Sequence, residues 1–378
     1  MARVHRHFLF FAFALCLMYV FGHAAQASAG LNASAWLPNW AQTEATSTVT
    51  SHQNLFSGAS PFWFYTDKEG KIHSLPGAAS NSVSGPLERA GMSEIPTVTA
   101  PIGPHKAIRL FTSRRLRERH VGRLVDLARP YEGLDFDYEH PALTTNLATA
   151  TRVRSALNVF YSDVCRALER HGRKCVITVM PRTSEEPQVW RGKLLPWVYD
   201  YEKIGQVADR VRVMAYDQHA GAYGPGPVAG APWVERVARF SSQNIPPEKV
   251  ELGIPLYGRR WAVGTRGAAR EVDVEGQRAD VHVAPKLAGG NELGSLTWEQ
   301  AKALKRECGA KTQWSRLEKA PYFRCSGEVT WFSNSRATVA RAQIAAHFGL
   351  RGVAFWAPYG EDPSTWEKLR RSGLFGHG

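Results

Sequence analysis

One short stretch of the chain, residues 132–140 (EGLDFDYEH), carries acidic side chains at alternate positions. Successive side chains of a β-strand point to opposite faces, so Asp135, Asp137 and Glu139 would project together from one face. Like charges a few ångströms apart cannot all ionise, and at least one of these carboxyl groups therefore keeps its proton near neutral pH. Such a group can act as a general acid, for example toward the leaving oxygen of a sugar.

The same spacing is compatible with two other kinds of site. Alternating carboxylates can bind a divalent cation such as Ca²⁺ or Mg²⁺, and they also occur on solvated strands at the edge of a sheet. The spacing favours acid catalysis over each alternative, but it leaves both open.

The acidic stretch is one of eight short apolar or β-branched runs that alternate with helical patterns. Several runs are almost continuously hydrophobic, which is typical of parallel strands covered by helices. Helical patterns are clearest over residues 151–171, which end before Gly172, and over residues 335–348, which open on a capping-type serine. The alternation predicts an α/β fold, a (β/α)8 TIM barrel. The expected strands are residues 34–40, 60–65, 95–101, 133–139, 175–180, 210–216, 250–256 and 352–356.

Barrel enzymes keep their chemistry at the C-terminal ends of the strands. Residues 133–139 form the fourth expected strand, so the acids would line the interior and Glu139 would sit at the mouth. One connection, between the seventh and eighth strands, is too long for a simple helix. We expect residues 262–329 to form a small inserted α+β subdomain, with a strand at 280–284 and a helix that opens on the capping box Thr297-x-x-Gln300.

Ordered motifs across the chain resemble those of glycoside hydrolase family 18, the chitinases and endo-N-acetylglucosaminidases. The acidic strand resembles the family signature Asp-Gly-x-Asp-x-Asp-x-Glu, and the resemblance extends over essentially the whole chain beyond residue 27. Two departures are Glu132 in place of the usual first Asp, and Tyr138 in place of the common Trp. The other matching segments are Trp36-Leu-Pro-Asn-Trp40, Met214-Ala-Tyr216-Asp217, Gly253-Ile-Pro-Leu-Tyr257-Gly-Arg259 and Gly352-Val-Ala-Phe-Trp356.

The resemblance implies a retaining mechanism in which the 2-acetamido group of the substrate, rather than a protein carboxylate, is the nucleophile. It implies that Glu139 is the acid/base and that Asp137 binds the acetamido N–H. Asp135 would lie behind Asp137 and share a proton with it. Tyr216 completes the implied catalytic set, and the implied substrate-binding residues are Asp217, Met214, Trp356, Trp36 and Arg259. No metal or other cofactor is expected.

The implied substrate is a β-1,4-linked polymer that contains N-acetylglucosamine, either chitin or peptidoglycan. The segments around residues 219–233 and 360–363 resemble the bacterial branch with spore-cortex and cell-wall hydrolases. Two alternatives remain open: a catalytically silent lectin on the same barrel, and an endo-β-N-acetylglucosaminidase that trims N-glycans.

The N-terminus has the pattern of a secretory signal peptide over residues 1–27, with two arginines, an apolar run and small residues at the cleavage position. Cleavage after Ala29 and an uncleaved anchor are alternatives. We therefore expect residues 28–378 to be a catalytic barrel that is exported to the periplasm or the exterior, is free of the membrane after cleavage, and is a monomer.

The 378-residue chain has a formal net charge of +13, and removal of Arg3 and Arg6 with the signal leaves the chain strongly basic. The sequence contains no nucleic-acid-binding motif, so we expect no nucleic-acid partner but a weak preference for anionic surroundings. An even number of cysteines beyond the signal predicts two disulfides in an exported protein. Of the three possible pairings we expect Cys165 with Cys175 and Cys308 with Cys325.

Overall fold

The computed structural model describes residues 30–376, except for 191–192, 195–196, 221–223 and 263–291. The expected signal peptide and the expected strand at 280–284 therefore lie outside the described residues. Within the described part of the chain, no helix is long and apolar enough to cross a membrane.

Eight parallel strands close into a barrel, which confirms the predicted α/β fold. The strands follow the order β1-β17-β11-β10-β7-β6-β5-β2, and parallel pairing of β1 with β2 closes the ring. Each expected run contributes one of these strands. Their bounds are β1 Asn32–Leu37, β2 Phe56–Thr66, β5 Thr97–Thr99, β6 Gly133–Asp137, β7 Lys174–Val179, β10 Arg210–Val213, β11 Val250–Pro255 and β17 Gly352–Trp356.

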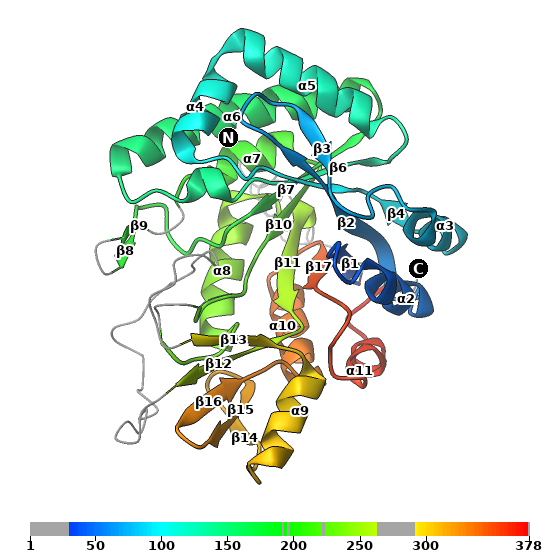
Figure 1. Ribbon diagram of the computed structural model, residues 1–378, viewed down its shortest axis with the longest axis vertical. Coiled ribbons are helices and arrows are strands. Elements are labelled where there is room, and N and C mark those ends of the chain that lie inside the picture. Colours follow the sequence, from blue (N-terminus) through cyan, green and yellow to red (C-terminus); the bar gives the residue numbers. More distant parts are fainter. Residues whose placement is uncertain (1–29, 191–192, 195–196, 221–223, 263–291, 377–378) are drawn as a thin grey trace, which may run out of the picture.

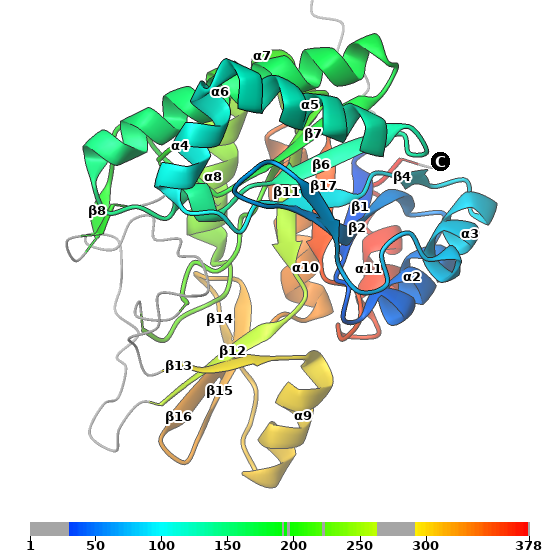
Figure 2. The same ribbon diagram turned by 45° about the horizontal axis from the view of Figure 1, so that its top comes forward.

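Helices cover the outside of the barrel, as Figures 1 and 2 show from two directions. Short strands β3 (Ile72–Ser74) and β4 (Ser93–Glu94) extend the sheet beside β2, and β8 (Val189–Trp190) pairs with β9 (Lys193–Leu194). The helices are α2 Gln42–Ser51, α3 Asn81–Arg89, α4 Pro104–Thr112, α5 Arg114–Ala128, α6 Leu147–Arg170, α7 Tyr201–Val207, α8 Ala231–Asn244, α10 Ser335–His347 and α11 Thr365–Arg371, with 3₁₀ turns at His140–Ala142 and Pro247–Lys249.

The two longer helical patterns begin earlier or on a different cap than the sequence suggested. Helix α6 starts a turn before residue 151, because the side chain of Asn146 accepts a hydrogen bond from the Thr149 backbone N–H. In α10 the cap is Asn334 and not Ser335, since it is the Asn334 side chain that accepts from the Ala337 N–H. Asn146 and Asn334 are ordinary N-caps, and each immediately precedes the first residue of its helix.

Strand β6 lies in the centre of the barrel wall and carries two of the three acids. Gly133 opens it because a Cβ there would lie 2.2 Å from the Lys174 carbonyl oxygen of the neighbouring strand. Every residue of β6 is buried. The side that faces away from the acids packs on α6: Phe136 meets Phe160 edge-on, and Tyr138 stacks on Phe160 with ring centroids 5.4 Å apart. The predicted alternation of β6 is therefore confirmed.

A second, antiparallel sheet lies between β11 and β17 in the chain and at one end of the molecule (Figure 2). Helix α9 (Trp298–Glu307) accompanies it and opens on the predicted Thr297–Gln300 capping box. This sheet begins at Gly258 and ends at Trp331, so it starts and ends a few residues outside the expected 262–329. Its order is β13 (Glu292–Leu296), β12 (Gly258–Ala262), β16 (Glu328–Trp331), β15 (Ala320–Cys325) and β14 (Gln313–Ser315).

Two disulfides are present, and they have the predicted pairing. Cys165 on α6 is bonded to Cys175 on β7, with their Cα atoms 5.1 Å apart. Cys308, after α9, is bonded to Cys325 at the end of β15, with a Cα separation of 5.9 Å. The first bond joins a helix to the barrel strand beneath it, and the second lies within the subdomain.

Candidate active site

Asp135 lies at the inner end of the acid stack, where it is fully buried and surrounded by donors. Its Oδ2 accepts hydrogen bonds from the Trp36 indole N–H (2.9 Å) and the Thr97 hydroxyl (3.0 Å). Its Oδ1 accepts from the Thr178 hydroxyl at 2.7 Å. The Arg212 guanidinium adds a charged donor 3.1 Å from Oδ2. Four donors from four other strands satisfy a buried carboxylate.

Arg212 joins Asp135 to a second buried acid at the closed end of the barrel. Its Nε donates to Glu251 Oε2 at 2.8 Å, while the Ser34 hydroxyl donates to the same oxygen. Burial opposes ionisation of Glu251, but the nearby Arg212 and Arg210 more than compensate, so that the pKa of Glu251 lies below its ordinary value. This end of the barrel is a compensated ion network.

Asp137, two residues further along β6, has no such compensation. Its Oδ1 is buried and makes no hydrogen bond to any described residue. Desolvation, and then the charges of Glu139 and Asp135, raise the pKa of Asp137 well above the ordinary value. The surroundings of the middle member of the stack therefore favour its protonated form.

Glu139 is not part of β6, which ends at Asp137; it immediately precedes the 3₁₀ turn His140–Ala142 and is partly exposed. Its backbone is no longer in the strand conformation, so the prediction that the strand extends to residue 139 is wrong. Its electrostatic coupling to the stack remains. Desolvation, and then the negative charge of Asp217, raise the pKa of Glu139 to about 7. A carboxyl group with this pKa can give and recover a proton near neutral pH.

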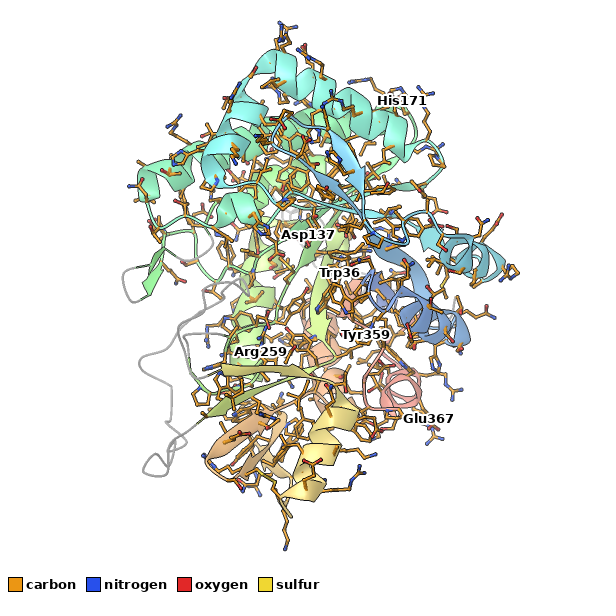
Figure 3. The ribbon with its side chains drawn as sticks, in the orientation of Figure 1. Trp36, Asp137, His171, Arg259, Tyr359 and Glu367 are labelled. Atoms are coloured by element: carbon orange, nitrogen blue, oxygen red, sulfur yellow. A yellow bond between two sulfur atoms is a disulfide. The ribbon has the colours of Figure 1, made fainter. Side chains whose placement is uncertain are left out.

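Asp217 follows β10 in a left-handed backbone conformation (φ 59°) and is buried. Its Oδ1 accepts from Arg259 Nε at 2.9 Å and Nη2 at 2.6 Å, and also from the Tyr257 hydroxyl. Arg259 is thus a buried partner of Asp217 and not a residue of the surface. The pair joins the mouth of the barrel to the first strand of the subdomain, where Figure 3 places Arg259.

Tyr216 and Met214 come from the same strand end as Asp217, and both are buried. Tyr216 meets the Trp36 ring edge-on at 6.4 Å. Gly253 on the neighbouring β11 makes room, because a Cβ there would lie 2.9 Å from the Tyr216 ring. Burial and nearby charges, with Tyr257 the largest of these, raise the pKa of Tyr216 well above its ordinary value, so its hydroxyl stays protonated.

The aromatic residues form a lower and an upper group. Trp36 is only 1% exposed and donates to Asp135, so it supports the acid stack from below and offers no surface to a ligand. Trp356 lies above it, edge-on at 6.3 Å, and is partly exposed. Trp40 is 65% exposed and Tyr359 is 39% exposed; the Trp40 indole N–H donates to the Tyr359 hydroxyl at 3.4 Å. Figure 3 shows Trp36 close to Asp137, and Tyr359 further toward α11.

The structure brings the nine predicted site residues to the interior and the mouth of one barrel, with Asp135 and Trp36 at the inner end, but the sequence did not indicate several of their partners. It did not select Arg212, Tyr257, Thr97, Thr178 or the exposed pair of Trp40 and Tyr359. A signal existed for Arg212, which stands between Val211 and Val213 within a predicted buried strand. A charged side chain inside a buried parallel strand requires a buried partner. The threonines carried no such signal.

A closed (β/α)8 barrel with an acid of raised pKa at its strand ends has the arrangement of an enzyme, and membership of a family shows which class of enzyme it is. The chain matches the model of the glycosyl hydrolases family 18 over residues 108–361 and belongs to this family. The resemblance inferred from the motifs is therefore confirmed. Among the described residues, no group of three or more His, Cys, Asp or Glu side chains is arranged to hold a metal ion.

Relatives of the chain include bacterial glycosylases and cortical fragment-lytic enzymes, and class V chitinases of plants. An uncharacterized glycosylase, YvbX, of Bacillus subtilis is 29% identical over 272 residues, which cover 70% of this chain and 69% of the relative. The cortical fragment-lytic enzyme of the same species is 23% identical over 264 residues. That alignment covers 68% of this chain but 54% of the relative, so the chain spans about half the length of that enzyme.

Solved structures share the fold. A chitinase from Chromobacterium violaceum superposes with a TM-score of 0.74 at 22% identity, covering 91% of this chain and 98% of that one. The spore cortex-lytic enzyme SleL of Bacillus megaterium gives a TM-score of 0.72 at 16% identity, covering 90% and 74%. At these identities the similarity establishes the architecture of the barrel.

Proposed function

We propose that the protein is an exported glycosidase that hydrolyses β-1,4 bonds of N-acetylglucosamine-containing polymers by a retaining, substrate-assisted mechanism. The observation that carries the proposal is the electrostatic gradient along the acid stack. Asp135 is fully paired, the pKa of Asp137 is raised well above its ordinary value, and the pKa of Glu139 at the mouth is raised to about 7. A proton donor is thereby held where a polymer can reach it.

In the first step Glu139 donates its proton to the glycosidic oxygen as the bond to the anomeric carbon breaks. The carbonyl oxygen of the substrate's own 2-acetamido group attacks that carbon from the opposite face and forms an oxazolinium ion. Asp137, whose buried Oδ1 has no partner among the described residues, accepts a hydrogen bond from the acetamido N–H and so holds the acetamido group in position for attack. Tyr216, whose hydroxyl is protonated, donates to the acetamido oxygen, and Trp356 forms the floor under the sugar ring.

In the second step Glu139, now ionised, takes a proton from a water molecule that attacks the anomeric carbon. The oxazolinium ring opens, the acetamide is restored, and the configuration of the anomeric carbon is retained. Asp217 is already bound to Arg259 and Tyr257, which supports a role in shaping the sugar site and in raising the pKa of Glu139.

Two features support export and a polymeric substrate. The pair of disulfides is typical of proteins that fold in an oxidising compartment, in agreement with the signal-like residues 1–27. The relatives include cortical fragment-lytic enzymes and chitinases. Peptidoglycan and chitin share the N-acetylglucosamine unit that the mechanism requires.

Product analysis tests the proposal. Wild-type protein and Glu139→Gln are incubated with chitohexaose and with purified peptidoglycan, and the products are identified by mass spectrometry and their first-formed anomer by NMR. We expect β-anomeric products with N-acetylglucosamine at the new reducing end, from the wild type alone. Glucosamine hexamer, which lacks the acetamido nucleophile, should resist cleavage. Equal cleavage of that hexamer would contradict substrate assistance.

The same experiment separates the alternatives. Binding of both polymers without any new reducing end would identify a lectin. Release of glycan from a glycoprotein, with chitohexaose and peptidoglycan left intact, would identify an endoglycosidase for N-glycans.

A further inference from the structure

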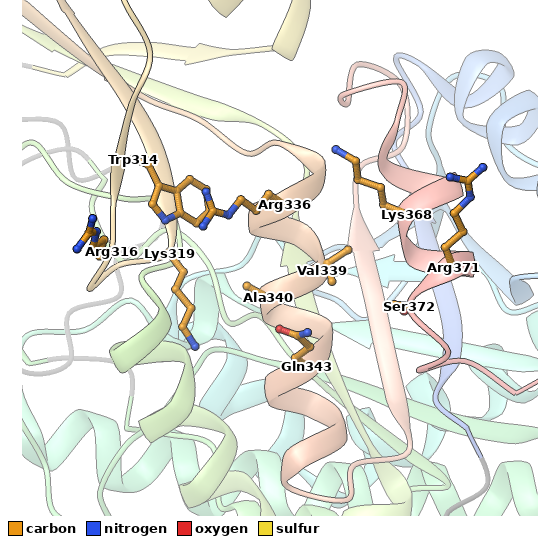
Figure 4. Close-up of a pocket in the computed structure, with 10 residues that line it drawn as sticks. All are labelled: Trp314, Arg316, Lys319, Arg336, Val339, Ala340, Gln343, Lys368, Arg371 and Ser372. Carbon is orange, nitrogen blue, oxygen red and sulfur yellow. The ribbon is translucent and has the colours of Figure 1, made fainter.

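A cavity of about 800 Å³ lies on the outside of the barrel, away from the acid stack. Its floor is one face of α10, formed by Arg336, Val339, Ala340 and Gln343, which are spaced three or four residues apart. One wall comes from residues 314–319 at the β14–β15 connection, and the other from α11 and the residue after it (Figure 4). We call this cavity the α10 trough. It lies within the size range of ligand sites.

The α10 trough is strongly basic. Arg316 and Lys319 line one wall, Lys368 and Arg371 line the other, and Arg336 rises from the floor. No acidic residue lines it. Of the four wall cations, Arg371 pairs with Glu367 at 2.5 Å, outside the lining. Cations that surround a concave surface concentrate the field and attract anions.

The wall that carries Arg316 and Lys319 is held in place by a buried arginine. Arg341, only 2% exposed, donates from its guanidinium to the backbone carbonyls of Glu318 (2.8 Å) and Lys319. Lys319 itself has a positive φ of 45°. The chain therefore keeps an unfavourable backbone conformation beside two exposed cations, and it fixes that turn to α10 with a buried charge.

The floor combines a cation with an aromatic ring. The Arg336 guanidinium lies over the Trp314 ring, 4.0 Å from its centroid. This stacking orients the guanidinium while its N–H groups remain available for a planar anion such as a carboxylate. The partly exposed Trp314 also offers an aromatic surface next to the cations, of the kind that sugar rings contact.

We propose that the α10 trough binds carboxylate groups of a glycan strand, and so directs the enzyme to peptidoglycan rather than to chitin. The inference rests on the proposed function, because it deepens the choice between the two polymers. Chitin is neutral and has nothing for five cations to recognise. Peptidoglycan carries carboxylates on its lactyl-peptide substituents, and these are anions that the cations of the trough can bind.

The test measures binding and not turnover, so its failure is distinguishable from failure of the proposed activity. In the full chain carrying Glu139→Gln, Arg316→Gln and Lys319→Asn are introduced together; Asn tolerates the positive φ. Pelleting assays use peptidoglycan freed of phosphate-containing polymers, the same material with its carboxyl groups amidated, and chitin. The matched control is Arg115→Gln with Arg119→Gln, which removes two exposed charges from α5.

We expect the trough variant to bind peptidoglycan about tenfold more weakly, as two exposed charge contacts imply. Amidation should weaken wild-type binding to the same extent, and neither change should alter chitin binding. Equal weakening by the α5 control, or no effect of amidation, would overturn the proposal. If the protein with the intact trough bound peptidoglycan only when the phosphate-containing polymers were left on it, the proposal would be overturned and the trough would be assigned to phosphodiesters. If the intact trough retained nucleic acid in preference to peptidoglycan, the proposal would also be overturned and the trough would be assigned to a nucleic-acid partner.

Discussion

The two ends of the barrel interior treat their carboxylates in opposite ways. At the closed end, Asp135 and Glu251 share Arg212 and are surrounded by hydroxyl and indole donors. At the mouth, no cation of the described residues offsets the burial that raises the pKa of both Asp137 and Glu139. The same residue types are therefore paired with a cation and with hydroxyl donors at one end, and have raised pKa values at the other. The difference is made by partners and not by the acids themselves.

This contrast explains why a stack of acids can be tolerated inside a fold. Asp135, at the paired end, is one of the charges that raise the pKa of Asp137. Loss of that pairing would leave buried charges unsatisfied, whereas loss of an acid at the mouth would remove chemistry and leave the fold intact.

The largest effect is expected at the mouth. Glu139→Gln removes the proton donor and keeps the shape, so kcat should fall by about 10³-fold or more, as for loss of a general acid. Initial rates on chitohexaose or peptidoglycan measure it. Glu132→Gln is the matched control, because Glu132 is an exposed acid of the same motif whose Oε2 accepts the Glu94 N–H, as an amide oxygen also can. A comparable loss in Glu132→Gln would contradict the assignment of the donor.

The closed end should respond in stability. Arg212→Met leaves Asp135 and Glu251 buried without their shared cation, and the free energy of unfolding should fall by about 3–5 kcal/mol. Chemical denaturation measures this loss. Arg210→Met is the control: its guanidinium is more exposed and lies 3.8 Å from Glu251, so the cost should be at most about 1 kcal/mol. Equal losses of stability in the two variants would contradict the assignment of Arg212 as the cation that compensates the buried acids of the closed end.

A smaller effect is expected in the pH profile. The negative charge of Asp217 helps to raise the pKa of Glu139, and Glu139 must be protonated to start the reaction. The wild-type rate should therefore decline as the pH rises through about 7. In Asp217→Asn that alkaline limb should shift by about one pH unit toward acid, because a like charge is lost while Arg259 stays. An unchanged limb in kcat/KM would show that another group controls it.

The smallest effect concerns stability at the mouth. The pKa of Glu139 is raised in the folded state. The stability that protonated Glu139 contributes to the fold is therefore fully present below about pH 4.5 and is lost as the pH rises toward 7. Glu139→Gln should therefore stabilise the protein by about 1 kcal/mol above pH 7 and by nothing near pH 4. Thermal melts at the two pH values measure the difference. If Glu139→Gln were less stable than the wild type at high pH, this result would contradict the claim that the ionised Glu139 carboxylate is buried at a cost in stability.

Much of the architecture could be predicted from local pattern. The eight runs, the alternation of β6 and the Thr297–Gln300 cap were all confirmed, because strand period and capping chemistry are properties of a few neighbouring residues. The end of β6 was placed two residues too late. The turn at Glu139 depends on contacts of the segment that follows, which a period of two cannot reveal.

The sequence by itself determined that three acids alternate along one short stretch and that other family motifs follow in order along the chain. Only the tertiary structure decided which acid is paired and which carries a proton. The donors to Asp135 come from positions 99, 43 and 77 residues away, on strands that meet it only in the closed barrel. A proton's position depends on burial and on nearby charges in space, and neither is a property of spacing along the chain.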